Sequence, residues 1–310
     1  MLFKTQKRMI HYLYNFFLTT SAKHRSSWFT RKIHWRLFKY LNANLIRYYQ
    51  TMSLDNLGVN KESDVIVSLT SYPGRINLVH FSIRSILNQT KRPKKVVLWL
   101  GKEFFVEGER SLPNSILELK PFGLEIEFCD DLKAHTKYFY VFQKYPDNLI
   151  VTIDDDIIYP INLIEILLKT YHKSPNSVVA NRVRYMEMDE NNFKPYRQWR
   201  LNSFNKTPSK KLFATGVSGV LYQPRFFNEA IFDVDGIKQT ECIGDDVWLK
   251  ACQILSGVAV VSTNYYFRQF IEIPESQNEN LHSTNVFNAD NDRQIKNVFN
   301  YFKINVKSFE

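Results

Sequence analysis

Residues 151–160 read VTIDDDIIYP, and three consecutive aspartates, Asp154, Asp155 and Asp156, stand between apolar runs. The apolar residues predict a buried strand that ends on these aspartates. Adjacent carboxylates repel one another, and burying them is costly unless a cation compensates their charge. Mg²⁺ and Mn²⁺ prefer carboxylate oxygens and complete their shell with water and substrate phosphates. We therefore expect these aspartates to form a metal site. A loop of solvated acids ahead of Pro160 is the alternative.

The chain around this stretch alternates between short apolar runs and segments with helical periodicity. The expected strands are 64–70, 94–100, 124–131, 148–156 and 177–182, and the expected helices are 78–89, 134–145, 161–173, 243–255 and 291–304. This alternation predicts an α/β fold with a mostly parallel sheet and helices on both faces. Such sheets bind ligands beyond the carboxyl ends of their strands. Residues 70–75, Asp131 and the three aspartates follow such ends, so we expect them to converge.

Three later segments carry polar groups or glycines that suit a binding site. Residues 184–211 are polar and aromatic without a clear period, which suggests a binding loop. Gly216 and Gly219 permit a close approach of the backbone to a ligand. Asp245 and Asp246 stand in the first turn of the helix expected at 243–255.

Five motifs, taken in order and spacing, resemble the GT-A fold glycosyltransferases, particularly the bacterial family 2-like enzymes of surface polysaccharide (capsule or O-antigen) biosynthesis. They are VSLTSYPGRI (67–76), SIRSILNQ (82–89), VTIDDDIIYP (151–160), ATGVSGVLYQP (214–224) and IGDDVWLKA (243–251). The resemblance covers about residues 61–270. It implies a Rossmann-like GT-A domain, a nucleotide-sugar donor, a DxD motif that holds Mn²⁺ or Mg²⁺ against the donor diphosphate, and a carboxylate base near the acceptor.

The resemblance also implies roles for individual residues. Asp154 and Asp156 satisfy DxD, whereas alignment on Pro160 makes Asp155 the main metal ligand, so the register is open. Asp245 and Asp246 stand where the family has Glu-Asp, and the second of that pair is the base, which favours Asp246. The residues expected to bind the nucleotide sugar are Thr70, Tyr72, Arg75, Asp131, Lys137, Asp154, Asp155, Gly216 and Gly219.

The expected function is therefore transfer of a sugar from a nucleotide-sugar donor to the hydroxyl of a glycan or a lipid-linked acceptor, with aromatic residues of 185–199 suited to stacking on sugar rings. Two alternatives remain. DDDII also has the form of the nucleophile motif of haloacid dehalogenase-type, Mg²⁺-dependent phosphatases. The chain could also be a non-catalytic scaffold at a membrane surface. His282 is either an additional metal ligand or a surface histidine.

Residues 1–60 form a separate unit by composition. The first 50 residues contain ten Lys and Arg and no Asp or Glu, so the whole net charge of +10 belongs to them. Ile33, Leu37, Leu41, Leu45 and Tyr48 recur at helical spacing, which predicts an amphipathic helix with a cationic border. Such a helix suits an anionic membrane surface. Packing on the main domain, a cleaved signal sequence and nucleic-acid binding are the alternatives, and we expect no nucleic-acid partner.

We expect a glycosyltransferase domain at 61–275 and a tail at 276–310 whose helix packs back on that domain. Three cysteines without a CxxC pair argue against a disulfide framework or a structural zinc site and favour a reducing compartment. Together these features predict a cytoplasmic protein attached to the inner face of the cell membrane.

Overall fold

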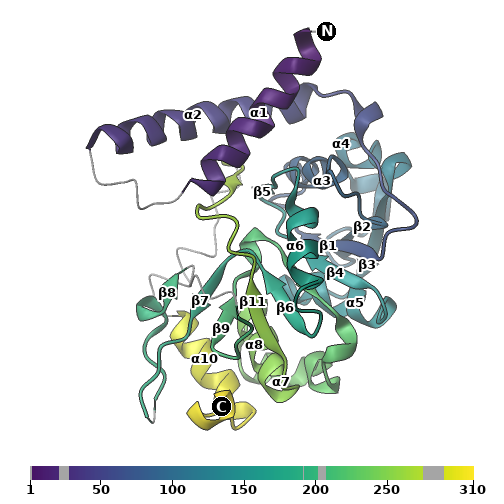
Figure 1. The fold of residues 1–310 in the computed structure, drawn as a ribbon. Coiled ribbons are helices and arrows are strands. Elements are labelled where there is room, and N and C mark those ends of the chain that lie inside the picture. Colours follow the sequence, from purple (N-terminus) through teal and green to yellow (C-terminus); the bar gives the residue numbers. More distant parts are fainter. Residues whose placement is uncertain (1, 21–27, 191, 202–206, 275–289) are drawn as a thin grey trace.

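A seven-stranded, mostly parallel sheet forms the centre of the computed structural model (Figure 1), which describes residues 2–20, 28–190, 192–201, 207–274 and 290–310. The strand order is β11-β6-β10-β4-β1-β2-β3. These strands are β1 (Val65–Ser71), β2 (Lys95–Gly101), β3 (Leu124–Cys129), β4 (Leu149–Thr152), β6 (Ser177–Ala180), β10 (Val220–Tyr222) and β11 (Ala259–Ser262). The predicted α/β class with a mostly parallel sheet is confirmed.

Helices cover both faces of the sheet because alternate side chains of each strand point to opposite sides. In β1, Val65, Val67 and Leu69 join one hydrophobic core with α3 and α6, whereas Ile66 joins a second core with α5 and α8. The helices of the domain are α3 (Val79–Leu87), α4 (Asn114–Leu117), α5 (Thr136–Lys144), α6 (Leu163–Tyr171), α7 (Val234–Gln239) and α8 (Asp245–Leu255).

One strand near the middle of the sheet runs against the others. β10 is antiparallel to both of its neighbours and pairs Val220 with Thr152 of β4 and with Ala180 of β6. A short turn at Gly216–Ser218 precedes it and redirects the chain. The sequence pattern did not predict this strand, whose three residues are too few to show a period.

The segment expected to be a binding loop contributes to the scaffold. It supplies β7 (Val183–Tyr185) and β8 (Arg200–Leu201), which form a small sheet with β9 (Leu212–Ala214). Trp199 is 2% exposed and Tyr196 is 9% exposed, and both rings pack against Phe213 in the second core. These two aromatic side chains therefore stabilise the fold and are not presented for stacking on a sugar. Residues 191 and 202–206 of this segment, and His282, lie outside the described residues.

The described part of residues 1–60 contains two α-helices that pack on the domain (Figure 1). These are α1 (Leu2–Thr19) and α2 (Trp28–Thr51). Leu41 and Leu45 of the predicted stripe are fully buried, but Ile33 is 49% exposed, and Tyr49 occupies the buried position expected for Tyr48. Both helices therefore pack on the main domain, which was one of the alternatives for this segment. They share the first core with β1. None of the described helices is both long and apolar enough to cross a membrane.

The C-terminal helix α10 (Asp290–Tyr301) packs on α8, as the apolar face of the tail predicts. Ile295, Val298 and Phe299 are buried, and the Phe302 ring centroid lies 4.9 Å from that of Trp248. Residues 276–289 of the expected tail lie outside the described part of the chain.

Candidate active site

The three aspartates follow β4 at the carboxyl end of the parallel strands. β4 pairs with β1 on one side and β10 on the other, and the Ile153 amide donates to the Ser68 carbonyl at 3.1 Å. The chain then leaves the sheet, because β5 (Ile157–Ile158) pairs with β12 (Ile271–Glu272) instead. The buried Tyr159 hydroxyl accepts a hydrogen bond from the Asp154 amide at 2.8 Å and closes the turn. The strand therefore ends at Thr152, just before the aspartates, and does not extend to residue 156 as expected.

Arg75 is the cation that compensates Asp155 and Asp156. Its Nη1 lies 2.9 Å from Asp155 Oδ1 and 3.0 Å from Asp156 Oδ2. The Ser71 hydroxyl donates to the other oxygen of Asp155 at 2.6 Å, and Asp155 is only 6% exposed. The loop after β1 thus holds the middle aspartate through both of its carboxylate oxygens.

Lys137 compensates the remaining acids from the opposite side. This buried lysine at the start of α5 lies 2.7 Å from Asp154 Oδ1 and 3.1 Å from Asp245 Oδ2. Burial opposes its charge, but the nearby carboxylates Asp154, Asp245 and Asp246 outweigh burial and raise the pKa of Lys137 well above its usual value. Lys137 therefore stays charged and joins the aspartates after β4 to those at the start of α8.

Asp246 lies in this cluster with less restraint than Asp245. Its Oδ1 accepts a hydrogen bond from the Gly216 amide at 2.9 Å, and a Cβ at Gly216 would lie only 3.1 Å from that oxygen. Burial, and then the neighbouring Asp245, raise the pKa of Asp246 to about 8. Burial thus outweighs the helix N-terminus, which favours the ionised form. A carboxylate that titrates near neutral pH is suited to general base catalysis.

Two of the three aspartates fit a divalent metal. Asp155 is committed to Ser71 and Arg75, and in the described regions no three His, Cys, Asp or Glu side chains converge on one metal position. Asp154 and Asp156 keep 28% and 14% of their side chains exposed. Burial, and then the adjacent Asp154, raise the pKa of Asp156 to about 7 against the opposing effect of Arg75. Mg²⁺ and Mn²⁺ commonly take only one or two protein carboxylates, so this pair is a sufficient donor set.

Tyr72 and Arg75 lie together in the predicted nucleotide loop, since Arg75 Cζ is 5.8 Å from the centre of the half-exposed Tyr72 ring. Thr70 instead donates its hydroxyl to the Trp99 carbonyl at 2.9 Å and so ties β1 to β2. Asp131 follows β3, which is separated from β4 by β1 and β2. At roughly 4.8 Å per strand, about 14 Å separates Asp131 from the aspartates along the same edge.

The two predicted glycines have different surroundings. Gly216 touches the cluster, because a Cβ there would approach both Asp246 and Lys137. Gly219 has φ +81° and faces Leu163 of α6, so its lack of a side chain serves the backbone turn before β10. The structure therefore unites Arg75, Lys137, Gly216 and the five aspartates, and sets Thr70, Asp131 and Gly219 apart.

Four residues near the cluster were not predicted: Ser71, Tyr159, Arg182 and Gln294. Ser71 could have been found, because it adjoins the predicted loop residues. Gln294 of α10 accepts hydrogen bonds from the amides of Ile243 and Gly244 at 2.9 and 2.8 Å and fixes the turn before α8. Its role depends on helix docking, which has no local sequence signal.

Among known proteins, this chain shows similarity to solved structures. No family model matches the sequence, and no curated protein does. The similar solved structures include S. aureus TarS residues 1–349 (TM-score 0.39, 10% identity, 65% of this chain and 59% of that chain). They also include the mannosyltransferase PcManGT from Pyrobaculum calidifontis in complex with GDP-Man and Mn²⁺ (0.40, 12%, 73% and 61%).

A third similar structure is CMP:2-keto-3-deoxy-manno-octonic acid synthetase complexed with CTP (0.36, 12%, 64% and 87%). The chain spans about three fifths of the length of the first two structures. The α/β class itself rests on the strands and helices described above.

Proposed function

We propose that this protein is a metal-dependent glycosyltransferase of the GT-A type, which moves a sugar from a nucleotide-sugar donor to a hydroxyl of a glycan or lipid-linked acceptor in cell-surface polysaccharide synthesis. The observation that carries the proposal is the meeting of Asp154, Asp245 and Asp246 around Lys137 at the carboxyl ends of the strands, with Asp156 held beside them by Arg75. That edge is where open α/β sheets bind ligands.

Asp246 acts as the general base in this proposal. An acceptor hydroxyl becomes a competent nucleophile when a carboxylate takes its proton as it attacks the anomeric carbon. Asp246 has one oxygen oriented by the Gly216 amide, and its pKa of about 8 makes it a stronger base than an ordinary aspartate. Asp245, which is 6% exposed and paired with Lys137, supports that lysine.

Asp154 and Asp156 would hold Mn²⁺ or Mg²⁺ in this site. When bound, such an ion stabilises the negative charge that grows on a departing diphosphate. Arg75 and Lys137 orient the aspartates and offset part of their negative charge, while Tyr72 and Arg75 line the nucleotide side of the loop after β1. Asp131 lies further along the same edge of the sheet, where the nucleobase of the donor could reach it.

The phosphatase and scaffold alternatives are less well supported. Three strands precede β4 in the chain, whereas the phosphatase nucleophile normally ends the first strand of its domain. The loop after β1, which the phosphatase hypothesis leaves unexplained, contacts Asp155 and Asp156 directly through Ser71 and Arg75. A scaffold has no need for a largely buried carboxylate that titrates near neutral pH.

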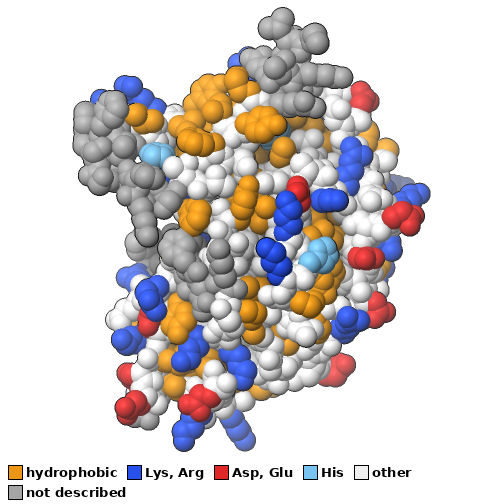
Figure 2. Space-filling model, in the orientation of Figure 1, with side chains coloured by type: hydrophobic (Ala, Val, Ile, Leu, Met, Phe, Trp, Pro, Cys, Tyr) orange, Lys and Arg blue, Asp and Glu red, His pale blue; other side chains and the backbone are white. Residues whose placement is uncertain are grey.

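The helices α1 and α2 provide the proposed attachment to an anionic membrane at the inner face of the cell membrane. Most exposed large hydrophobic side chains of the described residues lie on these helices (Figure 2): Met9, Tyr12, Phe16, Ile33, Trp35, Phe38 and Tyr40. Lys32, Arg36, Lys39 and Arg47 are exposed on α2 beside them. Aromatic side chains interleaved with cations match an anionic lipid interface.

A thermal-shift screen of the full chain tests the proposed transferase function. The ligands are UDP-, GDP-, CMP- and dTDP-sugars, each with and without Mn²⁺, and GDP-mannose is included because a similar structure contains it. We expect one nucleotide class to raise the melting temperature only when Mn²⁺ is present. No metal-dependent shift with any of them contradicts the proposal.

A further inference from the structure

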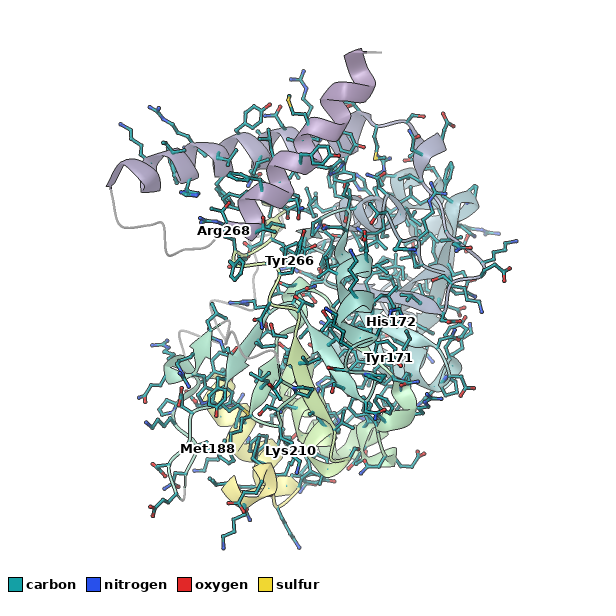
Figure 3. All side chains as sticks on the ribbon, in the orientation of Figure 1. Tyr171, His172, Met188, Lys210, Tyr266 and Arg268 are labelled. Carbon is teal, nitrogen blue, oxygen red and sulfur yellow. The ribbon has the colours of Figure 1, made fainter. Side chains whose placement is uncertain are left out.

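A cavity of about 360 Å³ is lined by residues of α1, of α2, of the turn at Gly216–Ser218 and of the segments 181–182 and 266–269. Its polar lining comes from Asn181, Arg182, Ser218, Arg268 and Gln269, and its aromatic lining includes Phe17, Phe38 and Tyr266. None of the described residues that line it is acidic. Figure 3 shows Tyr266 and Arg268 beside the end of α1, where the Phe267 amide donates to the Leu18 carbonyl at 2.8 Å. The volume falls in the range of small-molecule sites.

Arg182 is the residue of this cavity that most needs a ligand. Among the described residues, none forms a hydrogen bond or an ion pair with its guanidinium, although most of that side chain is withdrawn from water. Burial lowers the pKa of Arg182, and the nearby Arg184 adds to this effect, whereas Tyr196, Asp246 and Glu272 act in the opposite direction. A largely desolvated guanidinium without a hydrogen-bond partner favours an anion with planar or tetrahedral oxygen acceptors.

The cavity adjoins the candidate base through one short turn. Gly216 donates its amide to Asp246 at one end of this turn, and Ser218 lines the cavity at the other. Asn181 donates to the Ser218 carbonyl at 2.9 Å, which joins the turn to the residue before Arg182. A group bound at Arg182 would therefore be separated by this one turn from Asp246, the residue proposed to activate the acceptor hydroxyl.

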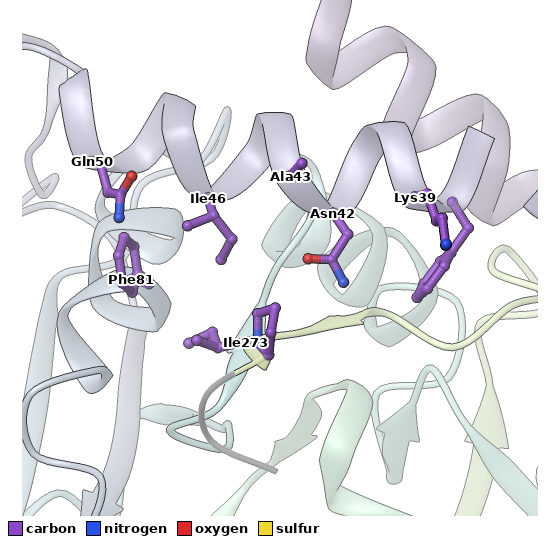
Figure 4. Close-up of a pocket in the computed structure, with 9 residues that line it drawn as sticks. Lys39, Asn42, Ala43, Ile46, Gln50, Phe81 and Ile273 are labelled. Carbon is purple, nitrogen blue, oxygen red and sulfur yellow. The ribbon is translucent and has the colours of Figure 1, made fainter. Parts of the chain in front are cut away.

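A second cavity, of about 510 Å³, lies under α2 (Figure 4). Phe38 lines both cavities. The other apolar lining residues of the second cavity are Ala43, Ile46, Phe81, Ile273 and Pro274, and its polar ones are Lys39, Asn42 and Gln50. A cationic chamber next to a mainly apolar one is complementary to an amphiphile that has an anionic head and a hydrocarbon chain.

We propose that the cavity at Arg182 binds the phosphate or diphosphate of an amphiphilic acceptor, whose apolar chain occupies the cavity under α2. This inference rests on the proposed transferase function and specifies its acceptor as a lipid phosphate or diphosphate that carries the sugar to be extended. The exposed aromatic residues of α1 and α2 would bring the same cavity to the membrane, from which such a lipid enters.

Binding of farnesyl diphosphate to the full chain tests this proposal, with farnesol and inorganic diphosphate as half-ligands. We expect farnesyl diphosphate to bind at least tenfold more tightly than either half-ligand. Arg182→Met should weaken farnesyl diphosphate binding at least tenfold, and Arg182→Lys should restore part of it. Arg225→Gln, which removes an exposed arginine that lines neither cavity, is the matched control and should bind as the parent does.

Two substitutions on α2 test the cavity under that helix. Ala43→Trp should fill the chamber and weaken farnesyl diphosphate several-fold, without changing the binding of inorganic diphosphate. Thr51→Trp adds the same ring at an exposed position outside the chamber and should leave both affinities unchanged. Circular dichroism and the melting temperature verify that each variant is folded.

Donor binding separates this proposal from the proposed function. The response to the nucleotide sugar with Mn²⁺ should be the same in Arg182→Met as in the parent. If Arg182→Met binds farnesyl diphosphate as the parent does, the inference is wrong while the transferase function stands. If Arg182→Met loses only the nucleotide sugar, Arg182 belongs to the donor site and the inference is also wrong. Absence of any donor response in the parent contradicts the transferase function itself.

Discussion

Lys137 donates a hydrogen bond to Asp154 across 2.7 Å and thereby joins the carboxyl end of β4 to the start of α8 through Asp245. Removing one partner of a buried ion pair leaves uncompensated charge and costs about 3–5 kcal/mol. We expect Lys137→Met to lower the free energy of unfolding by this amount, measured by urea denaturation.

Lys144 supplies a matched control on the same helix. It pairs with Glu127, but 44% of its side chain is exposed. An exposed pair contributes at most about 1 kcal/mol, so Lys144→Met should have a small effect. Equal losses in the two variants would show that the pairing of Lys137 with Asp154 and Asp245 is not what makes it important.

Asp246→Asn should abolish sugar transfer and also stabilise the fold. Asparagine keeps the acceptor for the Gly216 amide but cannot take a proton, so we expect transfer to fall by roughly 10²–10⁴-fold. Because one pKa unit corresponds to about 1.4 kcal/mol, removing the buried charge should raise the free energy of unfolding by at least about 1 kcal/mol at pH 8.

The gain in the free energy of unfolding in Asp246→Asn should depend on pH, because the pKa of Asp246 is raised in the folded protein. Unfolded Asp246 loses its proton near its ordinary value of 3.8, whereas the folded protein keeps it until about pH 8. The folded state binds more protons between these values, so its stability falls as the pH rises through that window. The gain from Asp246→Asn should therefore be largest at pH 8 and disappear below pH 4. Asp235→Asn, on α7, is the control, and a gain that does not depend on pH would contradict this account.

Single changes to asparagine should resolve which aspartates contact the metal. We expect Asp154→Asn and Asp156→Asn each to weaken Mn²⁺ binding at least tenfold in the presence of the preferred nucleoside diphosphate, measured from free Mn²⁺ by electron paramagnetic resonance. Asp155→Asn should instead lower the melting temperature with little change in Mn²⁺ affinity, because Ser71 and Arg75 hold that carboxylate. A loss of Mn²⁺ affinity in Asp155→Asn alone would reverse the assignment.

Attachment to a membrane should depend on exposed aromatic residues of both α1 and α2. In flotation with vesicles that contain phosphatidylglycerol, we expect Tyr12→Ser combined with Trp35→Ser to reduce the bound fraction several-fold. Vesicles of phosphatidylcholine alone should bind the parent weakly, because they lack the negative charge that complements α2.

The control for flotation is the pair Phe104→Ser and Val106→Ser, which removes exposed apolar side chains from another surface. This control should bind phosphatidylglycerol vesicles as the parent does. Equal binding of all three proteins would exclude α1 and α2 as the contact surface.

Much of the fold could be predicted from local pattern. The apolar run before Asp154 and the helical period after it are enough to define β4 and α6, and similar runs define β1, β2 and β3. β10 could not be predicted, because its three residues become a strand only through pairing with β4 and β6. The buried role of Trp199 was missed for a similar reason, since the ring that it packs against, Phe213, is distant in sequence.

The candidate site was predictable where a residue type implies a chemistry. Three adjacent aspartates require cations, and the sequence suggested a metal, whereas the structure adds Arg75 and Lys137 as protein cations for the same charges. Lys137 was expected to touch the donor, but its pairing with Asp245 depends on α5 and α8 packing on the same face of the sheet. Arg182 could not be recognised, because one arginine at the end of an expected strand has no distinguishing pattern.

The Tyr14 hydroxyl has a consequence for the order in which the molecule is completed. It donates to the Ile158 carbonyl and accepts from the Ile271 amide, which lie 144 and 257 residues further along the chain. During synthesis α1 therefore leaves the ribosome long before either partner exists. Until residue 271 has emerged, Ile10, Phe17 and Leu18, which later enter the core, lack their native cover. We expect the nascent chain to rely on a chaperone or a lipid surface throughout that interval.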